Sequence, residues 1–254
     1  LLRIVVFIWF LKRMAIYLIM KNIYINPLFY VFSFIFLVTG FFKPFLFMMI
    51  YLIVHEFGHI IVAFGFGYKV MKINVYPCGL LTIFDMKIND SIIKNFLIAI
   101  SGPLFQCLCY LVLKKYYEIH LFLIVFNLLP IYPLDGSKIF GCFLYLIFPY
   151  KKSNKFLFIS SYILSLSILI YFIFNFNLIY ILIFSILFMR SIEFYKNRKY
   201  LFNMFILERL LYNFNFLFIK KIDNINYMYK GRYHYIKYKN NYIEEKKYLS
   251  FFNK

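Results

Sequence analysis

The chain has 254 residues, of which 64% are hydrophobic and 15% are charged, and its mean hydropathy is +0.76. This apolar content exceeds what the core of a soluble domain of this length needs, and several apolar runs are long enough to cross about 30 Å of hydrocarbon. The net charge of +19 does not indicate nucleic-acid binding, because no RNA- or DNA-binding motif accompanies it. We therefore predict an all-α polytopic membrane protein.

Residues 1–24 form an apolar stretch that is interrupted by four charges, Arg3, Lys12, Arg13 and Lys21. A charge at the centre of a span costs about 2.5–3.5 kcal/mol on insertion scales. This favours an N-terminal extension that is interfacial or poorly ordered over a true span. No small-residue cleavage site follows, so we do not expect a signal peptide.

A transmembrane domain is predicted over residues 25–194, with about six transmembrane helices. Their expected ranges are 28–42, 45–65, 92–113, 119–147, 156–174 and 178–192. The fourth range is too long for one straight span and contains Pro130, Pro133 and Gly136, so we expect a discontinuous helix there.

Two segments of the chain are more polar than the predicted spans. Residues 73–84 alternate in the manner of strands around a Pro-Cys-Gly turn, which predicts a short membrane-associated β-hairpin. Residues 195–254 are charged and rich in Tyr and Lys, which predicts a small α/β tail domain in the cytosol.

The distribution of Lys and Arg predicts the orientation in the membrane. With six spans and a cytoplasmic N-terminus, the loops and the tail that carry most basic residues lie inside. Only Lys43, Lys114 and Lys115 then lie outside, and Lys138 lies within the membrane. The positive-inside rule therefore favours cytoplasmic N- and C-termini.

The segment VHEFGHI, residues 54–60, lies in the second predicted span. His55 and His59 are four residues apart, so they share one helix face and both imidazoles can bind one metal ion. Glu56 lies about 100° further round the helix, where it can move a proton beside the metal. Zn²⁺ suits imidazole and carboxylate ligands with one open position. Buried histidines without a metal are the alternative, but ionisable groups in hydrocarbon are costly.

A third metal ligand is expected at Asp135, within NLLPIYPLDG at residues 127–136. Pro130 and Pro133 deny this segment regular helical hydrogen bonds. Such backbone is tolerated inside a membrane only where it lines a buried or watery site. We therefore expect a zinc site between the second and fourth transmembrane helices, with Gly136 giving backbone freedom.

The motifs HEFGH, SGPLFQ at 101–106 and NLLPIYPLDG resemble the site-2 protease family of intramembrane zinc metalloproteases. Together with FILERLL at 205–211 and MYKGRYHYI at 228–236, they resemble its sporulation stage IV FB branch across residues 25–254. The resemblance implies that His55, His59 and Asp135 are the metal ligands. It also implies that Glu56 is the catalytic base and that Asn127 and Pro133 bind substrate. Gln106 stands where many relatives carry Asn.

The resemblance implies a role in regulated intramembrane proteolysis during sporulation. The expected partners are a protein substrate such as a sigma-factor precursor, membrane lipid and membrane inhibitor proteins, on the mother-cell side of the forespore membrane. The tail resembles part of a CBS-type module. ATP binding at the tail and self-association of the chain are both left open. His234 belongs either to that module or to the surface. The alternative function is a zinc-binding membrane transporter or sensor, which needs no general base such as Glu56.

Overall fold

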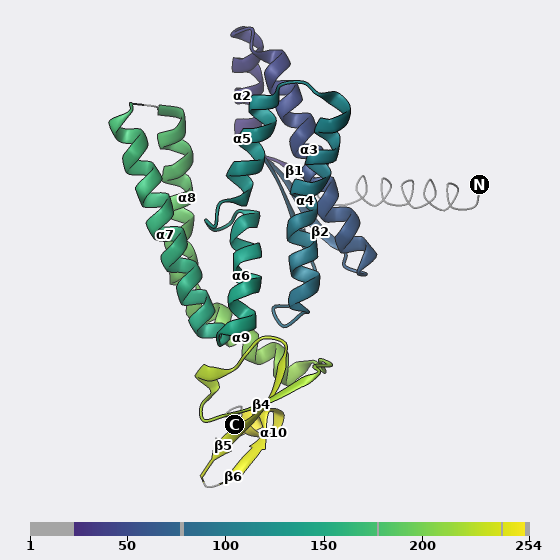
Figure 1. Cartoon of the computed structure of the whole chain (residues 1–254), viewed down its shortest axis with the longest axis vertical. Helices are drawn as coiled ribbons and strands as arrows, with labels where there is room; N and C mark the ends of the chain where they lie inside the picture. Colours follow the sequence, from purple (N-terminus) through teal and green to yellow (C-terminus); the bar gives the residue numbers. More distant parts are fainter. Residues whose placement is uncertain (1–22, 77–78, 177, 240, 252–254) are drawn as a thin grey trace, which may run out of the picture. The chain divides into compact units, whose positions relative to one another are not determined.

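The computed structural model describes residues 23–76, 79–176, 178–239 and 241–251 (Figure 1). The prediction for residues 1–22 lies outside the described residues. Three described helices are long and apolar enough to cross a membrane: α3 (Phe42–Gly65), α4 (Ile92–Leu113) and α7 (Tyr150–Phe174). Two shorter apolar helices are α2 (Pro27–Val38) and α5 (Tyr117–Leu128). These apolar helices are typical of a membrane protein. The number of six spans remains a prediction.

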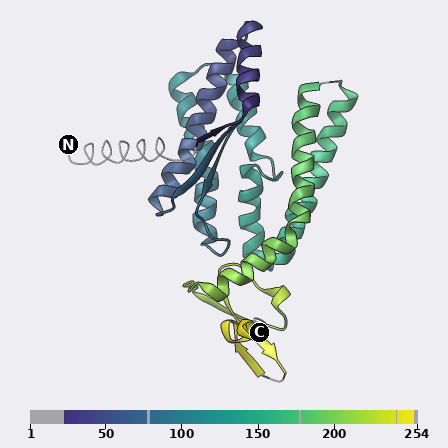
Figure 2. The same cartoon turned by 180° about the vertical axis from the view of Figure 1, so that it is seen from behind.

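The chain divides into two compact units, and the first contains residues up to Met86 together with Ser101–Ile124. Its sheet has three strands in the order β1 (Ile23–Ile25), β2 (Val70–Tyr76) and β3 (Gly79–Phe84), seen from behind in Figure 2. β1 is parallel to β2, and β3 is antiparallel to it.

One face of this sheet packs against helix α3. Ile60 of α3 is buried with Val70 and Ile73 of β2, and further apolar side chains of α3 and β3 surround them. In β3 the exposed Leu81 and Ile83 alternate with more buried neighbours, as the two-residue period of a strand requires, whereas the register of β2 shifts between Val70 and Lys72. The sheet therefore lies beside the helix that carries the HEFGH motif.

The second unit contains Lys87–Ile100 and the chain from Val125 onward. It includes α6 (Asp135–Ile147), α7, α8 (Leu178–Lys196) and α9 (Arg198–Leu211). Helices α7 and α8 run side by side in both views (Figures 1 and 2). Ser161 and Ser165 of α7 and Ser191 of α8 are fully buried, as small residues at close helix contacts in membranes are.

The predicted interruption of the fourth apolar segment is confirmed, because α5 ends at Leu128 and α6 begins at Asp135. The hydroxyl of Ser161 accepts a hydrogen bond from the main-chain N–H of Tyr132 at 3.0 Å and donates to the carbonyl of Pro130 at 3.4 Å. The N–H of Tyr132 and the carbonyl of Pro130 thus find hydrogen-bond partners outside a helix. The chain can therefore be non-helical here even in an apolar environment.

The tail beyond α9 forms a second three-stranded sheet, in which β4 (Phe218–Ile222) is parallel to β5 (Arg232–Tyr238). β6 (Asn241–Glu244) is antiparallel to β5 and leads into α10 (Glu245–Ser250). A short 3₁₀ turn, Ile225–Tyr227, joins β4 to β5. Phe205 of α9 packs with Met228 and Ile236 of the tail, and these three residues are fully buried. The likeness to a CBS-type module stays a prediction.

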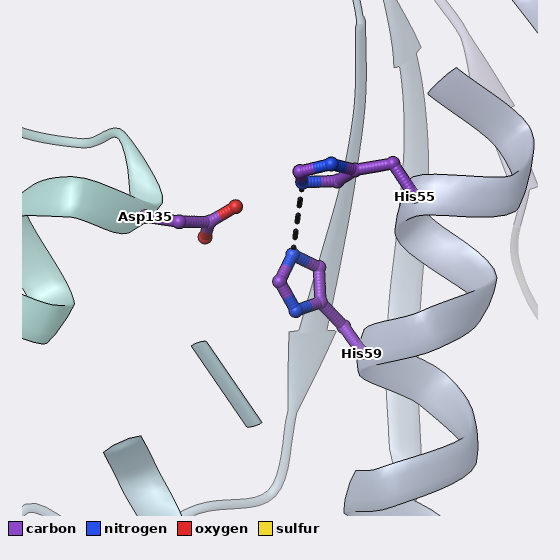
Figure 3. A group of neighbouring side chains, drawn as sticks. All are labelled: His55, His59 and Asp135. Carbon is purple, nitrogen blue, oxygen red and sulfur yellow. Dashed lines mark hydrogen bonds between the residues drawn. The ribbon is translucent and has the colours of Figure 1, made fainter. Parts of the chain in front are cut away.

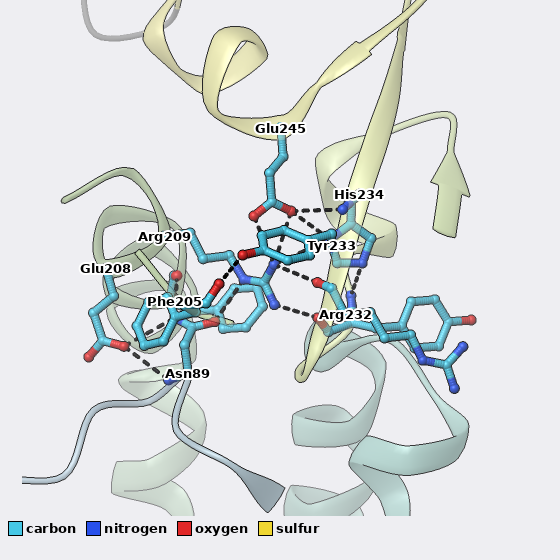
Figure 4. A network of polar contacts seen from close by, with 10 residues as sticks. Asn89, Phe205, Glu208, Arg209, Arg232, Tyr233, His234 and Glu245 are labelled. Carbon is cyan, nitrogen blue, oxygen red and sulfur yellow. Dashed lines mark hydrogen bonds and ion pairs between the residues drawn. The ribbon is translucent and has the colours of Figure 1, made fainter. Parts of the chain in front are cut away.

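A buried polar network joins α9 to the tail sheet (Figure 4). The guanidinium of Arg209 donates to Glu245 at 3.0 Å, to Asn89 at 2.7 Å and to the main-chain carbonyls of Tyr229 and Arg232. His234 is 1% exposed and contacts Glu245 at 2.8 Å, so of the two alternatives left open for this histidine the surface position is wrong. Burial lowers the pKa of His234, and the hydrogen bond to Glu245 opposes that shift.

Candidate metal centre

His55 and His59 lie one turn apart on α3, and both side chains are 4% exposed. Their Nε2 atoms are 3.2 Å apart. Two nitrogens that share a tetrahedral zinc ion at bond lengths of about 2.0–2.1 Å would lie about 3.3 Å apart. The pair is therefore already set at the separation that one zinc ion requires, as the four-residue spacing predicts.

Glycine at position 102 of α4 makes room for both imidazoles. A Cβ atom at Gly102 would lie 2.4 Å from Nε2 of His59 and 2.7 Å from Nε2 of His55. On α3, a Cβ at Gly58 would lie 2.7 Å from the main-chain oxygen of Ser101. The two glycines let α3 and the SGP segment approach closely, as small residues do between membrane helices.

His55 also contacts a residue outside the HEFGH motif. Its Nδ1 atom lies 3.0 Å from Oε1 of Gln106 on α4. Gln106 is fully buried, and its Nε2 donates to the main-chain oxygen of His120 at 3.3 Å. Sequence reasoning identified SGPLFQ only as a family motif, and neither Gly102 nor Gln106 was assigned a place in the site.

Glu56 is buried, and its Oε1 accepts a hydrogen bond of 2.7 Å from the main-chain N–H of Thr82. Thr82 lies in β3, which has a single neighbouring strand in the described sheet. The carboxylate of Glu56 is therefore tied to the outer strand of the sheet. A backbone amide is a fixed donor, so it restricts the position of this carboxylate without supplying a charge.

Asp135 is the first residue of α6, and its side chain is buried. A negative charge at a helix N-terminus is favoured by the helix dipole. Lys138, one turn further on and half exposed, donates to Asp135 Oδ1 at 2.7 Å. A Cβ at Gly136 would lie 2.1 Å from the main-chain oxygen of Leu128, so only glycine allows the end of α5 and the start of α6 to approach this closely.

His55, His59 and Asp135 form a group that can hold a metal ion (Figure 3). Each of the three residues is buried and offers one ligand atom, a ring nitrogen or a carboxylate oxygen. Two imidazoles and one carboxylate form a donor set that catalytic zinc sites use, with the fourth position left for water or substrate. The donor chemistry and the separation of the imidazoles therefore both fit zinc.

The two residues expected to bind substrate are partly exposed. Asn127 lies near the end of α5, and Pro133 lies in the segment between α5 and α6. Partial exposure is compatible with contact to another chain, and the roles of both residues remain predictions.

No family model matches the chain. Stage IV sporulation protein FB of Bacillus subtilis is 26% identical over an alignment of 210 residues, which covers 74% of this chain and 71% of that protein. A zinc metalloprotease of Methanocaldococcus jannaschii is 28% identical over an alignment of 156 residues, which covers 55% of this chain but only 45% of that protein.

A solved structure gives independent evidence for the fold. The site-2 protease from Methanocaldococcus jannaschii matches with a TM-score of 0.53 and 23% identity, over 67% of this chain and 89% of that chain. The long apolar helices, the donor set and the two relatives agree with this fold. The chain therefore has the fold of a site-2 protease, and its sequence is similar to a stage IV sporulation protein and to a zinc metalloprotease.

Proposed function

We propose that the chain cleaves a sporulation sigma-factor precursor at or near the membrane, in regulated intramembrane proteolysis. The observation that carries the proposal is the buried pair of imidazoles at zinc-sharing distance, with Glu56 next to it in the sequence. The similarity to a stage IV sporulation protein supports the sporulation role. The substrate class follows from the resemblance of the motifs.

In this proposal His55, His59 and Asp135 are the metal ligands. When bound, the zinc ion supplies Lewis acidity toward a carbonyl oxygen and lowers the pKa of a water molecule. The imidazoles offer neutral nitrogen donors, and Asp135 contributes one negative charge. The carboxylate accepts a hydrogen bond from Lys138 and lies at the N-terminus of α6, and a carboxylate has to be deprotonated to bind a cation.

Glu56 is the proposed general base and acid. The Thr82 amide holds Oε1, and we assign the proton to Oε2. The carboxylate takes a proton from the attacking water and returns it to the leaving amine. General acid–base catalysis of this kind contributes about 10²–10⁴-fold to a rate. Asn127 would hold the substrate backbone or the developing oxyanion, and Pro133 would lie against the substrate.

The outer edge of β3 is the proposed place for an extended substrate. A peptide bond within a helix is shielded, so the cleaved segment has to unwind, and an exposed strand can then pair with it. β3 is at the edge of its described sheet, and its Thr82 amide contacts Glu56. Strand addition at this edge would bring the substrate backbone toward the catalytic carboxylate.

The membrane setting of the proposal includes surrounding lipid and cytoplasmic termini. The tail carries many basic residues, including Lys220, Lys221 and Lys237, which fits the cytoplasmic side and an acidic protein substrate. Membrane inhibitor proteins, self-association and ATP at the tail belong to the same proposal through the resemblance to the stage IV FB branch.

Co-expression with a candidate sigma-factor precursor tests the function. Glu56→Gln is expected to abolish the cleaved product while the purified protein retains its zinc. Glu118→Gln is the matched control, because Glu118 is exposed on α5, and it is expected to leave cleavage unchanged. Cleavage of the precursor by the Glu56→Gln variant would contradict the proposed mechanism. Zinc transport that continues in this variant, without proteolysis, would instead support the transporter alternative.

A further inference from the structure

Gln106 connects a proposed metal ligand to the main chain of α5 within the first unit. Its side chain is fully buried, and its amide group lies between His55 and the main chain of α5. The two ends of an amide differ, because the oxygen accepts hydrogen bonds and the nitrogen donates them. The orientation of this amide therefore decides which hydrogen bond His55 can make.

The main-chain oxygen of His120 fixes the orientation of the Gln106 amide. A carbonyl can only accept, so the amide nitrogen faces it, at 3.3 Å. The amide oxygen, Oε1, then faces Nδ1 of His55 at 3.0 Å and can only accept from it. His55 must therefore carry its hydrogen on Nδ1. Its Nε2 atom is left with a lone pair, and this is the atom that lies 3.2 Å from Nε2 of His59.

The surroundings of His120 keep that carbonyl in place. The His120 ring stacks on Tyr110, with ring centroids 4.3 Å apart and an interplanar angle of 15°. Tyr51, which is fully buried, lies on a neighbouring side with its centroid 5.3 Å from that of His120. The Tyr51 hydroxyl donates to the main-chain oxygen of Lys115 at 2.5 Å, just before α5 begins. Tyr51 of α3 thus contacts both the residue just before α5 and the ring of His120, whose carbonyl Gln106 contacts.

We propose that Gln106 is a positioning residue that sets the tautomer and ring orientation of His55 for metal binding through Nε2. The inference rests on the proposed metal-ligand role of His55. A hydrogen bond to the second nitrogen of a ligating histidine typically changes metal affinity by 10–100-fold. A merely structural role of Gln106 predicts a loss of stability without any change in the affinity of the folded protein for zinc.

Zinc affinity of the full chain in detergent, measured by competition with a chromophoric chelator, tests the proposal. Gln106→Met keeps the size of the side chain and removes both hydrogen bonds, so affinity should fall about 10–100-fold. Gln106→Glu keeps an acceptor for His55 and should restore most of that affinity. Leu108→Met is the matched control, because Leu108 is exposed on the same helix, and it should bind zinc as the unaltered chain does.

Two further measurements separate the inference from the function on which it depends. His55→Ala should abolish tight zinc binding, and retained binding in that variant would show that the metal site itself is wrong. Wild-type affinity in Gln106→Met, with zinc lost in His55→Ala, would overturn the role of Gln106 alone. If Gln106→Met does not fold, ¹⁵N chemical shifts of His55 in the metal-free, unaltered chain decide the matter. The Nδ1–H tautomer is expected, and the Nε2–H tautomer would overturn the proposal.

Discussion

Gly102→Ala adds only one methyl group, yet it should disable the metal centre. The added Cβ would lie 2.4 Å from Nε2 of His59, whereas an ordinary contact is about 3.5 Å, so this imidazole must retreat by about 1 Å. His55, at 2.7 Å, must also move. Ligand distances in metal sites tolerate only about 0.2 Å, so one zinc ion can no longer reach both nitrogens in their present positions.

The expected loss is at least about 100-fold in zinc affinity, which corresponds to about 2.8 kcal/mol at 1.4 kcal/mol per factor of ten. The free energy of unfolding of the metal-free chain should fall by about 1–3 kcal/mol, the usual cost of an added methyl group in a packed interior. Chelator competition measures the affinity, and thermal unfolding without zinc measures the stability.

Two glycines on the neighbouring helix α3 provide controls. Gly65→Ala adds a Cβ with no atom within 4 Å, so zinc affinity should stay unchanged. Gly58→Ala meets the main-chain oxygen of Ser101 at 2.7 Å, so it should lower stability by separating the helix backbones. If Gly102→Ala binds zinc as tightly as Gly65→Ala does, the imidazoles do not hold the ion in the positions described here, and the reasoning is refuted.

The remaining predictions concern the second unit. Gly136→Ala should lower stability by about 3 kcal/mol in thermal unfolding, because its Cβ would meet main-chain oxygen at 2.1 Å; a cost below 0.5 kcal/mol would contradict this close approach. Glu245→Ala should cost about 3–5 kcal/mol in denaturant unfolding, because it leaves the buried Arg209 guanidinium without its carboxylate; an unchanged midpoint would contradict the network. Burial lowers the pKa of Lys230 from 10.5 to about 8. The unfolded chain then binds more protons between these values, so stability should rise with pH from about 8 to 10.5. Lys230→Met should therefore stabilise the protein by up to about 3 kcal/mol at pH 7 and by less at pH 10, and equal effects at both would refute the assignment.

The sequence predicts those features that depend on residues close together in the chain. The spacing of His55 and His59 places them on one helix face, and the structure confirms that their nitrogens meet. The bounds of α4 agree with the predicted apolar run 92–113. Pro130 and Pro133 predict the interruption between α5 and α6, because proline lacks the N–H that a continuous helix needs.

Features that depend on distant segments could not be read from the sequence. The need for glycine at position 102 arises from the distance between α4 and two imidazoles on α3. The role inferred for Gln106 depends on the main-chain oxygen of His120, which a sequence pattern does not reveal. The parallel pairing of β1 with β2 joins segments that are separated by a whole helix hairpin, and three apolar residues do not specify such a partner.

The buried guanidinium of Arg209 makes α9 and the tail one inseparable piece. Three of its acceptors, the carbonyls of Tyr229 and Arg232 and the carboxylate of Glu245, come from beyond β4, and the fourth comes from Asn89 before α4. Removal of the chain after α9 would leave the buried guanidinium of Arg209 without most of its acceptors. A chimera that takes its tail from a relative must therefore include α9 and the Asn89 loop of that relative, because otherwise the chimera is expected to misfold.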